Sequence, residues 1–146
     1  MLQKSMVLGG NAELELMLAD ECAQFYSDPY GWAMWAFDWD HGELAGFSGL
    51  DDWPVDPIRN ATASGHGIGK SAVTAIVILW IMSTRPHAKG IVTANTGEQL
   101  RTKTWAELGK WRTRCIVGHW FEYNNGKGSM SLYHKAWPES WRVDAQ

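Results

Sequence analysis

The stretch Ile58-Arg-Asn-Ala-Thr-Ala-Ser-Gly-His-Gly-Ile-Gly-Lys-Ser71 determines how the rest of the chain is organised. Residues 58–63 can form a short strand, and residues 64–69 form a glycine-rich turn. Lys70 and Ser71 follow the turn, and a long apolar segment then continues to Thr84. A strand, a glycine-rich turn and an apolar helix in this order predict a crossover unit whose turn faces a ligand.

Each residue type in this stretch suits the binding of a triphosphate. Gly65, Gly67 and Gly69 permit turn conformations that a side chain would oppose, so successive N–H groups can converge on one anion. The helix that begins near Gly69 adds the positive end of its dipole. Lys70 offers a flexible positive charge to the outer phosphates, and the Ser71 hydroxyl suits a magnesium ion. The pattern is that of a P-loop.

The predicted nucleotide site follows directly from this pattern. Its residues are Ser64, Gly65, His66, Gly67, Ile68, Gly69, Lys70 and Ser71. Ser64 stands where the usual pattern has a glycine, but it is small and keeps its N–H group. Lys70 is the predicted catalytic residue and Ser71 the predicted Mg²⁺ ligand, with ATP and Mg²⁺ as cofactors.

The composition indicates a folded globular protein. The chain has 146 residues, of which 45% are hydrophobic and 20% are charged, and its net charge is −3. It therefore has no overall basic excess for nucleic acid, although a local basic patch is a candidate. The patch comprises Arg101, Lys103, Lys110, Arg112 and Arg114. The ten tryptophans are interpreted as core residues, with base-stacking platforms as the alternative.

Residues 1–57 are predicted to form an N-terminal arm, a helix, an aromatic segment and a loop. Asn11 is a candidate N-cap, and apolar residues recur after it at helical spacing as far as Phe25. This amphipathic helix should end before Asp28, which precedes a proline. Residues 40–57 are rich in Gly, Asp and Pro and indicate a loop.

After the glycine-rich turn, alternating helix and strand patterns predict a parallel sheet. Residues 70–84 form an apolar helix that should be buried on both faces, or against one sheet and a missing partner. Residues 90–95 form a second strand. Thr96 and Gln99 form a capping box that opens a helix to about Cys115. Leu100, Thr104, Leu108 and Trp111 should share one face of that helix. Strand–helix–strand–helix order is typical of parallel sheets with right-handed crossovers.

The C-terminal residues predict a β-hairpin. Residues 120–123 and 129–134 flank a glycine- and asparagine-rich turn, and residues 141–144 can begin another strand. The predicted fold is thus α/β: a P-loop NTPase sheet of the RecA/ASCE type with flanking helices, incomplete, and with a C-terminal β-hairpin. Residues 1–57 form the arm, and residues 58–146 form a partial P-loop ATPase domain.

Several sequence blocks together resemble the ATPase part of tailed-bacteriophage terminase large subunits. The blocks are residues 61–71, 80–87 and 92–108, and residues 135–144 and Asp28-Pro29 fit the same group. The resemblance covers nearly the whole chain. It implies an ATPase that drives double-stranded viral DNA into a prohead, in the host cytoplasm and without a membrane span. The implied partners are the viral DNA, the terminase small subunit, the portal protein and further copies in a ring.

The resemblance also implies an acidic Walker B strand with a catalytic glutamate, and a separate nuclease domain. Residues 72–146 contain neither, so we expect an N-terminal piece with little or no turnover of its own. Pro54 follows Trp53 where relatives have a glutamine that helps to hold adenine. The alternatives are a nucleotide-binding module without turnover, an unrelated small P-loop kinase or NTPase, and the unstable product of a decayed gene.

Overall fold

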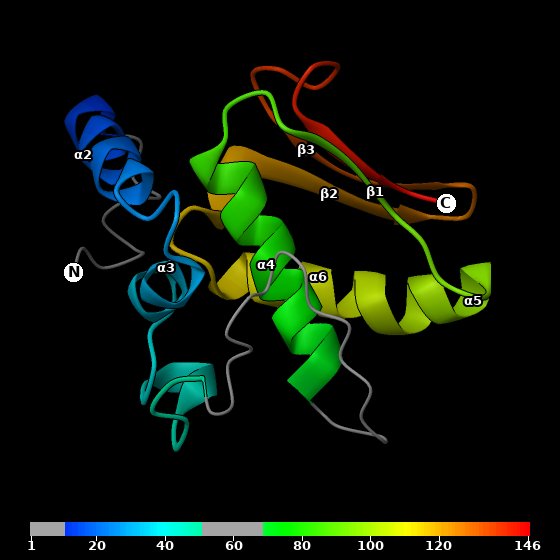
Figure 1. The fold of residues 1–146 in the computed structure, drawn as a ribbon, viewed down its shortest axis with the longest axis horizontal. Coiled ribbons are helices and arrows are strands. Elements are labelled where there is room, and N and C mark those ends of the chain that lie inside the picture. The colour runs from blue at the N-terminus through cyan, green and yellow to red at the C-terminus, as the bar shows by residue number, and fades with distance from the viewer. Residues whose placement is uncertain (1–10, 51–68) are drawn as a thin grey trace.

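A computed structural model describes residues 11–50 and 69–146, which form helices beside a four-stranded sheet (Figure 1). The helices are α2 (Ala12–Ala23), α3 (Pro29–Ala36), η1 (Gly42–Leu44), α4 (Gly69–Thr84), α5 (Gly97–Gln99), η2 (Leu100–Trp105), α6 (Ala106–Arg114) and η3 (Gly118–Trp120). The strands are β1 (Lys89–Val92), β2 (Phe121–Gly126), β3 (Ser129–His134) and β4 (Arg142–Ala145). The predicted strand at residues 58–63 and the turn at residues 64–68 lie outside the described residues.

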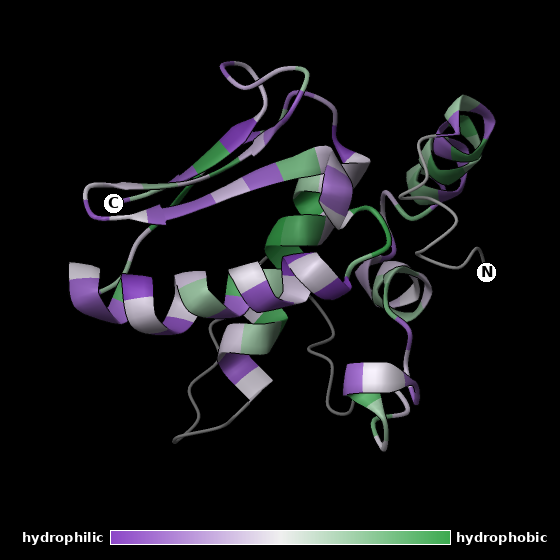
Figure 2. Cartoon of the chain, turned by 180° about the vertical axis from the view of Figure 1, so that it is seen from behind, coloured by the Kyte–Doolittle hydropathy of each residue, from purple (hydrophilic) through white to green (hydrophobic). Residues whose placement is uncertain are grey.

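Helix α4 forms the centre of the hydrophobic core. It begins at Gly69 and ends at Thr84, as its sequence pattern predicted. Its C-terminal half is buried, with Ile76, Leu79 and Trp80 at most 1% exposed. Figure 2 shows the same division, because α4 is hydrophobic over its middle and C-terminal turns and more polar where it begins. The expected burial of both faces is therefore confirmed for the C-terminal half and not for the first turn.

Helices α2 and α3 pack beside α4, on the side away from the sheet (Figure 1). The Asn11 side chain accepts a hydrogen bond from the Glu13 N–H, so the predicted N-cap is confirmed. Helix α2 ends at Ala23, earlier than predicted, and hydrogen-bonded turns lead from there to α3. Asp28 caps α3 by accepting a hydrogen bond from the Gly31 N–H at 2.8 Å.

The helix predicted after Thr96 is present as one continuous run of α5, η2 and α6, which we call the long helix. The Thr96 hydroxyl accepts a hydrogen bond from the Gln99 N–H at 3.1 Å, as the capping box requires. Its middle part, η2, is a π-helix. The wider π turn brings residues five positions apart near one another. Leu100 and Trp105 are five apart and both are 0% exposed, so the π turn directs both into the core.

Removal of the Thr96 cap should weaken the start of the long helix. We expect Thr96→Ala to lower the free energy of unfolding by about 1 kcal/mol, because one N–H of the first turn then loses its acceptor. Thr96→Ser keeps the hydroxyl and is the matched control. Urea unfolding followed by circular dichroism measures both variants, and equal losses for the two would show that the hydroxyl does not act as a cap.

The sheet has the strand order β1-β4-β3-β2. Strand β1 pairs with β4 in parallel, whereas β4 with β3 and β3 with β2 pair antiparallel. The predicted hairpin and the predicted last strand are confirmed, and the sheet is mixed rather than parallel throughout. The sheet is mixed because it contains the hairpin, and a tight turn can join only antiparallel neighbours.

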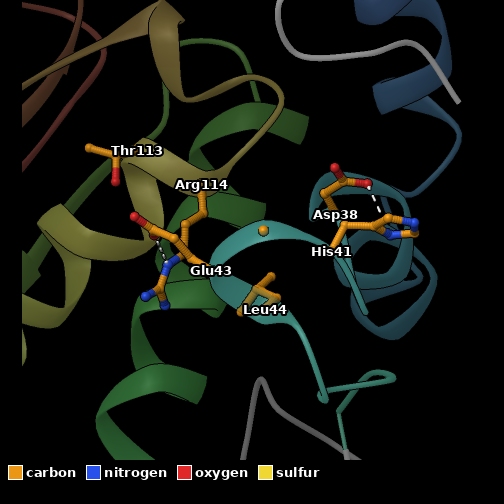
Figure 3. Close-up of a pocket in the computed structure, with 7 residues that line it drawn as sticks. Asp38, His41, Glu43, Leu44, Thr113 and Arg114 are labelled. Carbon is orange, nitrogen blue, oxygen red and sulfur yellow. Dashed lines mark hydrogen bonds and ion pairs between the residues drawn. The ribbon is translucent and has the colours of Figure 1, made fainter.

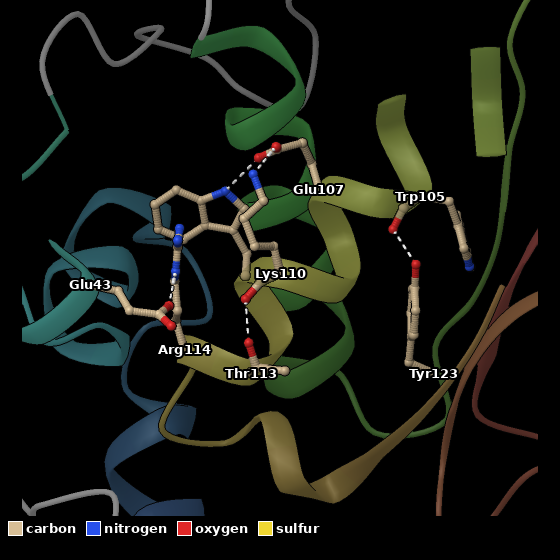
Figure 4. A network of polar contacts seen from close by, with 8 residues as sticks. Glu43, Trp105, Glu107, Lys110, Thr113, Arg114 and Tyr123 are labelled. Carbon is tan, nitrogen blue, oxygen red and sulfur yellow. Dashed lines mark hydrogen bonds and ion pairs between the residues drawn. The ribbon is translucent and has the colours of Figure 1, made fainter. Parts of the chain in front are cut away.

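One face of the sheet lies on the long helix. Leu132 and Val143 are directly paired, are buried, and point to this face. Tyr123 lies in the same row, and its hydroxyl donates a hydrogen bond to the Trp105 carbonyl oxygen at 2.7 Å (Figure 4). Burial raises the pKa of the Tyr123 hydroxyl, which therefore stays a donor. The contact fixes the sheet to the π-helical segment.

Side chains of the long helix also cover the outer edge of β2. Arg112 donates from Nε and Nη2 to the Phe121 carbonyl oxygen at 2.9 and 2.7 Å. The indole of Trp105 donates to the Asn124 carbonyl oxygen at 2.8 Å. The two Arg112 bonds satisfy a carbonyl group that the edge strand would otherwise present to another chain, whereas the Asn124 carbonyl lies on the side of β2 that pairs with β3.

Candidate nucleotide-binding site

The candidate site is the start of α4, which contains the lysine and serine of the predicted P-loop. Gly69 is exposed, and Lys70 and Ser71 are half-buried in the first helical turn. Among the residues that the structure describes, none comes within 4 Å of a side chain added at Gly69. The first N–H groups of a helix lack intrahelical partners and favour anions.

Three of the eight predicted site residues therefore come together in one helical turn. They are Gly69, Lys70 and Ser71, and the backbone oxygen of Lys70 accepts a hydrogen bond from the Thr74 hydroxyl at 3.0 Å. The other five predicted site residues lie outside the described residues: Ser64, Gly65, His66, Gly67 and Ile68. The described geometry can offer N–H donors, an ammonium group and a hydroxyl to one anion.

The buried end of α4 holds this turn in a fixed direction. The Trp80 indole donates to the Phe25 carbonyl oxygen at 2.8 Å, and the Trp141 indole donates to the Met82 carbonyl oxygen at 2.9 Å. The Arg85 guanidinium lies between the Tyr26 and Trp80 rings, 4.1 and 4.4 Å from their centres. A binding turn works best on a rigid element, and these contacts make α4 such an element.

Three of the five acidic residues that follow Ser71 in sequence are engaged by basic side chains. Glu98 accepts from Arg101 at 2.9 Å. Glu107 accepts from Lys110 and from the Trp111 indole (Figure 4). Glu122 lies 3.6 Å from the Lys135 ammonium group. Phosphoryl transfer needs a residue that orients the attacking water, and these three glutamates are held by other side chains instead.

Three of the five residues in the predicted basic patch on the long helix have acidic partners. Arg101 pairs with Glu98, Lys110 pairs with Glu107, and the Arg114 Nε lies 2.9 Å from Glu43. The Arg112 guanidinium is directed at a backbone carbonyl of β2. The described face therefore lacks the concentration of unpaired positive charge that phosphate backbones require.

A cavity of about 260 Å³ lies between η1 and the end of α6 (Figure 3). Its lining residues are Asp38, His41, Gly42, Glu43, Leu44, Thr113 and Arg114. Its charged groups face one another, since Arg114 bonds Glu43 and His41 lies 3.9 Å from Asp38. The sequence did not predict this cavity, because its two walls are about 70 positions apart and carry no shared motif.

Most of the described tryptophans are structural. Trp32, Trp80 and Trp105 are 0% exposed, and Trp111 and Trp141 are each 8% exposed. Trp137 is 53% exposed. The core interpretation is thus favoured over a base-stacking surface. Burial also raises the pKa of the Cys22 thiol, which donates to the Ser83 carbonyl oxygen and is no candidate nucleophile.

Comparisons of the chain with protein families, with curated proteins and with solved structures found no match. In the part of the chain that the structure describes, no cluster of His, Cys, Asp and Glu could hold a metal ion. Across the same residues, no helix is both long and apolar enough to cross a membrane. The start of α4 therefore remains the best candidate site, on its own geometry and on the sequence around it.

Proposed function

We propose that the chain is the nucleotide-binding portion of a tailed-bacteriophage terminase large subunit. Within the complete motor, this portion binds ATP and Mg²⁺, and hydrolysis moves double-stranded DNA into the prohead. Its partners are the viral DNA, the terminase small subunit, the portal protein and other copies of the subunit in a ring. On this proposal the mixed sheet is part of a P-loop ATPase sheet in the host cytoplasm.

The observation that carries the proposal is the start of α4. The helix begins at Gly69, directly after the glycine-rich stretch, and Lys70 and Ser71 lie in its first turn. A P-loop requires this arrangement, because its lysine and hydroxyl must reach the phosphates and the magnesium ion from the helix start. Strand β1 then follows α4 and leads into the long helix, in the order that a crossover unit requires.

A second candidate function is a nucleotide-binding module that does not hydrolyse ATP. The pairing of Glu98, Glu107 and Glu122 with basic side chains favours it for residues 1–146 by themselves. Phosphoryl transfer needs a residue that orients the attacking water, in addition to phosphate binding. The two candidates share one site and differ only in turnover.

Isothermal titration of the purified chain with Mg-ATP tests the shared site. We expect saturable binding, and we expect Lys70→Ala to weaken it about 10- to 100-fold, because a charged hydrogen-bond partner of the phosphates is lost. Lys103→Ala is the matched control, since Lys103 is an exposed lysine on η2 and should leave the affinity unchanged. Ser71→Ala should weaken Mg-ATP more than ATP in the presence of a chelator.

Absence of any heat of binding by the folded chain would overturn both candidates. Equal affinities of Lys70→Ala and the unmodified chain would show that nucleotide binds elsewhere. A turnover on the order of 1 per second by residues 1–146 would exclude the non-hydrolysing candidate.

A further inference from the structure

The imidazole of His134 lies in an aromatic cluster at one end of the sheet. His134 is the last residue of β3, and its ring stacks on Trp141 with centres 4.2 Å apart and planes 9° from parallel. Phe121 meets the His134 ring edge-on at 5.6 Å. His87, in the turn between α4 and β1, lies 5.6 Å from the Trp141 ring. The cluster thus joins residues beside all four strands at this one end of the sheet.

A backbone hydrogen bond determines which form of His134 fits this cluster. The Ala136 N–H donates to Nδ1 of His134 at 3.1 Å. Nδ1 must therefore carry a lone pair, and the proton of the neutral ring must be on Nε2. Protonation of Nδ1 would place two donors against each other and break the bond.

The surroundings of the ring do not compensate a positive charge. The charged and titratable groups on the elements around it are Arg85, His87, Lys89, Glu122, Lys135, Glu139, Arg142 and Asp144. Glu122 pairs with Lys135, and Asp144 pairs with Arg142. Among the described residues, no carboxylate accepts a hydrogen bond from His134. Burial lowers the pKa of His134, and the nearby His87 lowers it further.

The stack on Trp141 acts in the opposite direction, because an indole face attracts a cation. It does not decide the outcome, since burial, the His87 charge and the lost Ala136 bond all favour the neutral ring. The net direction is the lowered pKa of His134.

The same cluster holds the last strand in place. The backbone N–H of His134 donates to the Trp141 carbonyl oxygen at 2.9 Å, and this bond closes the loop 135–141. The Trp141 indole donates to the Met82 carbonyl oxygen at the C-terminal end of α4. The Arg142 N–H donates to the Ala88 carbonyl oxygen at 3.0 Å and begins the pairing of β4 with β1. The His134 ring adds the stack on Trp141 and the acceptor for Ala136 to these bonds, so its loss should loosen both the loop and β4.

We propose that His134 is an acid-sensitive latch, which holds the loop 135–141 and β4 on α4 while its imidazole is neutral and releases them when Nδ1 is protonated. Because the pKa of His134 is lower in the folded state, the latch contributes its full stability above the ordinary histidine pKa of about 6.5. That contribution is lost as the pH falls through the folded-state pKa. The proposal of a latch does not rest on the proposed nucleotide-binding function.

Hydrogen-exchange protection of the Ala136 amide and the Trp141 indole N–H, measured by NMR, tests the latch. Between about pH 7 and about pH 5, we expect the protection of both groups in the unmodified chain to fall about tenfold or more. His134→Asn is the matched variant, because its amide oxygen can accept the Ala136 N–H and does not titrate. Its protection should be the same at both pH values.

Direct titration of the His134 imidazole in the unmodified chain gives an independent result, which does not depend on the folding of a variant. We expect its midpoint below the ordinary value, and His87→Asn should move the midpoint upward. An equal loss of protection in the unmodified chain and in His134→Asn would overturn the latch. A midpoint at or above the ordinary histidine value would overturn it as well.

Discussion

Replacement of Trp80 by alanine should lower the free energy of unfolding by about 3–5 kcal/mol. Trp80 is 0% exposed in the buried half of α4, so the substitution leaves a cavity where its indole was packed. It also removes the donor to the Phe25 carbonyl oxygen and the ring under the Arg85 guanidinium. The free energy of unfolding of a domain of this size is about 5–15 kcal/mol, so the variant should be close to unfolding.

Urea unfolding followed by far-ultraviolet circular dichroism measures this loss without relying on tryptophan fluorescence. Trp137→Ala is the matched control, because Trp137 is 53% exposed and its removal should change stability by only about 0.5 kcal/mol. Trp80→Phe keeps most of the volume but removes the indole donor to the Phe25 carbonyl, which keeps its bond from the Asp28 N–H, and should cost about 0.5–1.5 kcal/mol. Equal stabilities for Trp80→Ala and Trp137→Ala would show that α4 is not the centre of the core.

The elements that the sequence predicted well are those with local signals at both ends. Asn11 and Thr96 cap their helices through side-chain oxygens, and a cap is recognisable from a few neighbouring residues. The hairpin is marked by Asn125, Gly126 and Gly128 between two apolar segments. Such signals act within a few positions of the chain, so one sequence is sufficient to interpret them.

The features that the sequence did not reveal depend on contacts between distant residues. Trp105 did not belong to the predicted apolar face of the long helix, because that face assumed α-helical spacing throughout. The position of β4 between β1 and β3 depends on pairing across about 50 residues. The pattern of a strand does not specify which other strand it pairs with. Arg114 belonged to a predicted basic patch, and its partner Glu43 is 71 positions away.

The candidate site was predictable for the same local reason as the caps. Lys70 and Ser71 follow a glycine-rich turn and precede an apolar segment, and the structure places both in the first turn of α4. The sequence did not show which partners the acidic side chains of the chain bind. The ion pairs of Glu98, Glu107 and Glu122 show that acidic residues near in sequence are committed to other partners.

Among the glycines in and beside the long helix, Gly118 should be the one whose replacement by alanine destabilises the fold most. A Cβ at this position would lie 1.9 Å from the Arg112 carbonyl oxygen and 3.0 Å from its carbonyl carbon. These are backbone atoms at the end of α6, so the clash cannot be relieved by rotation of a flexible side chain. We expect a loss of about 3 kcal/mol, at the upper end for overpacking in a core.

Gly97→Ala is the matched control, because a Cβ there would meet nothing within 4 Å and Gly97 is the first residue of α5. Alanine restricts the unfolded chain and favours the helix, so this variant should be neutral or up to about 1 kcal/mol more stable. Chemical unfolding of both variants gives the comparison. The Gly118 variant should also weaken the bond from Arg112 to the Phe121 carbonyl, which covers the edge of β2. A wild-type stability for Gly118→Ala would mean that the close approach of η3 to the end of α6 is not needed for the fold, because the backbone there could then move apart without loss.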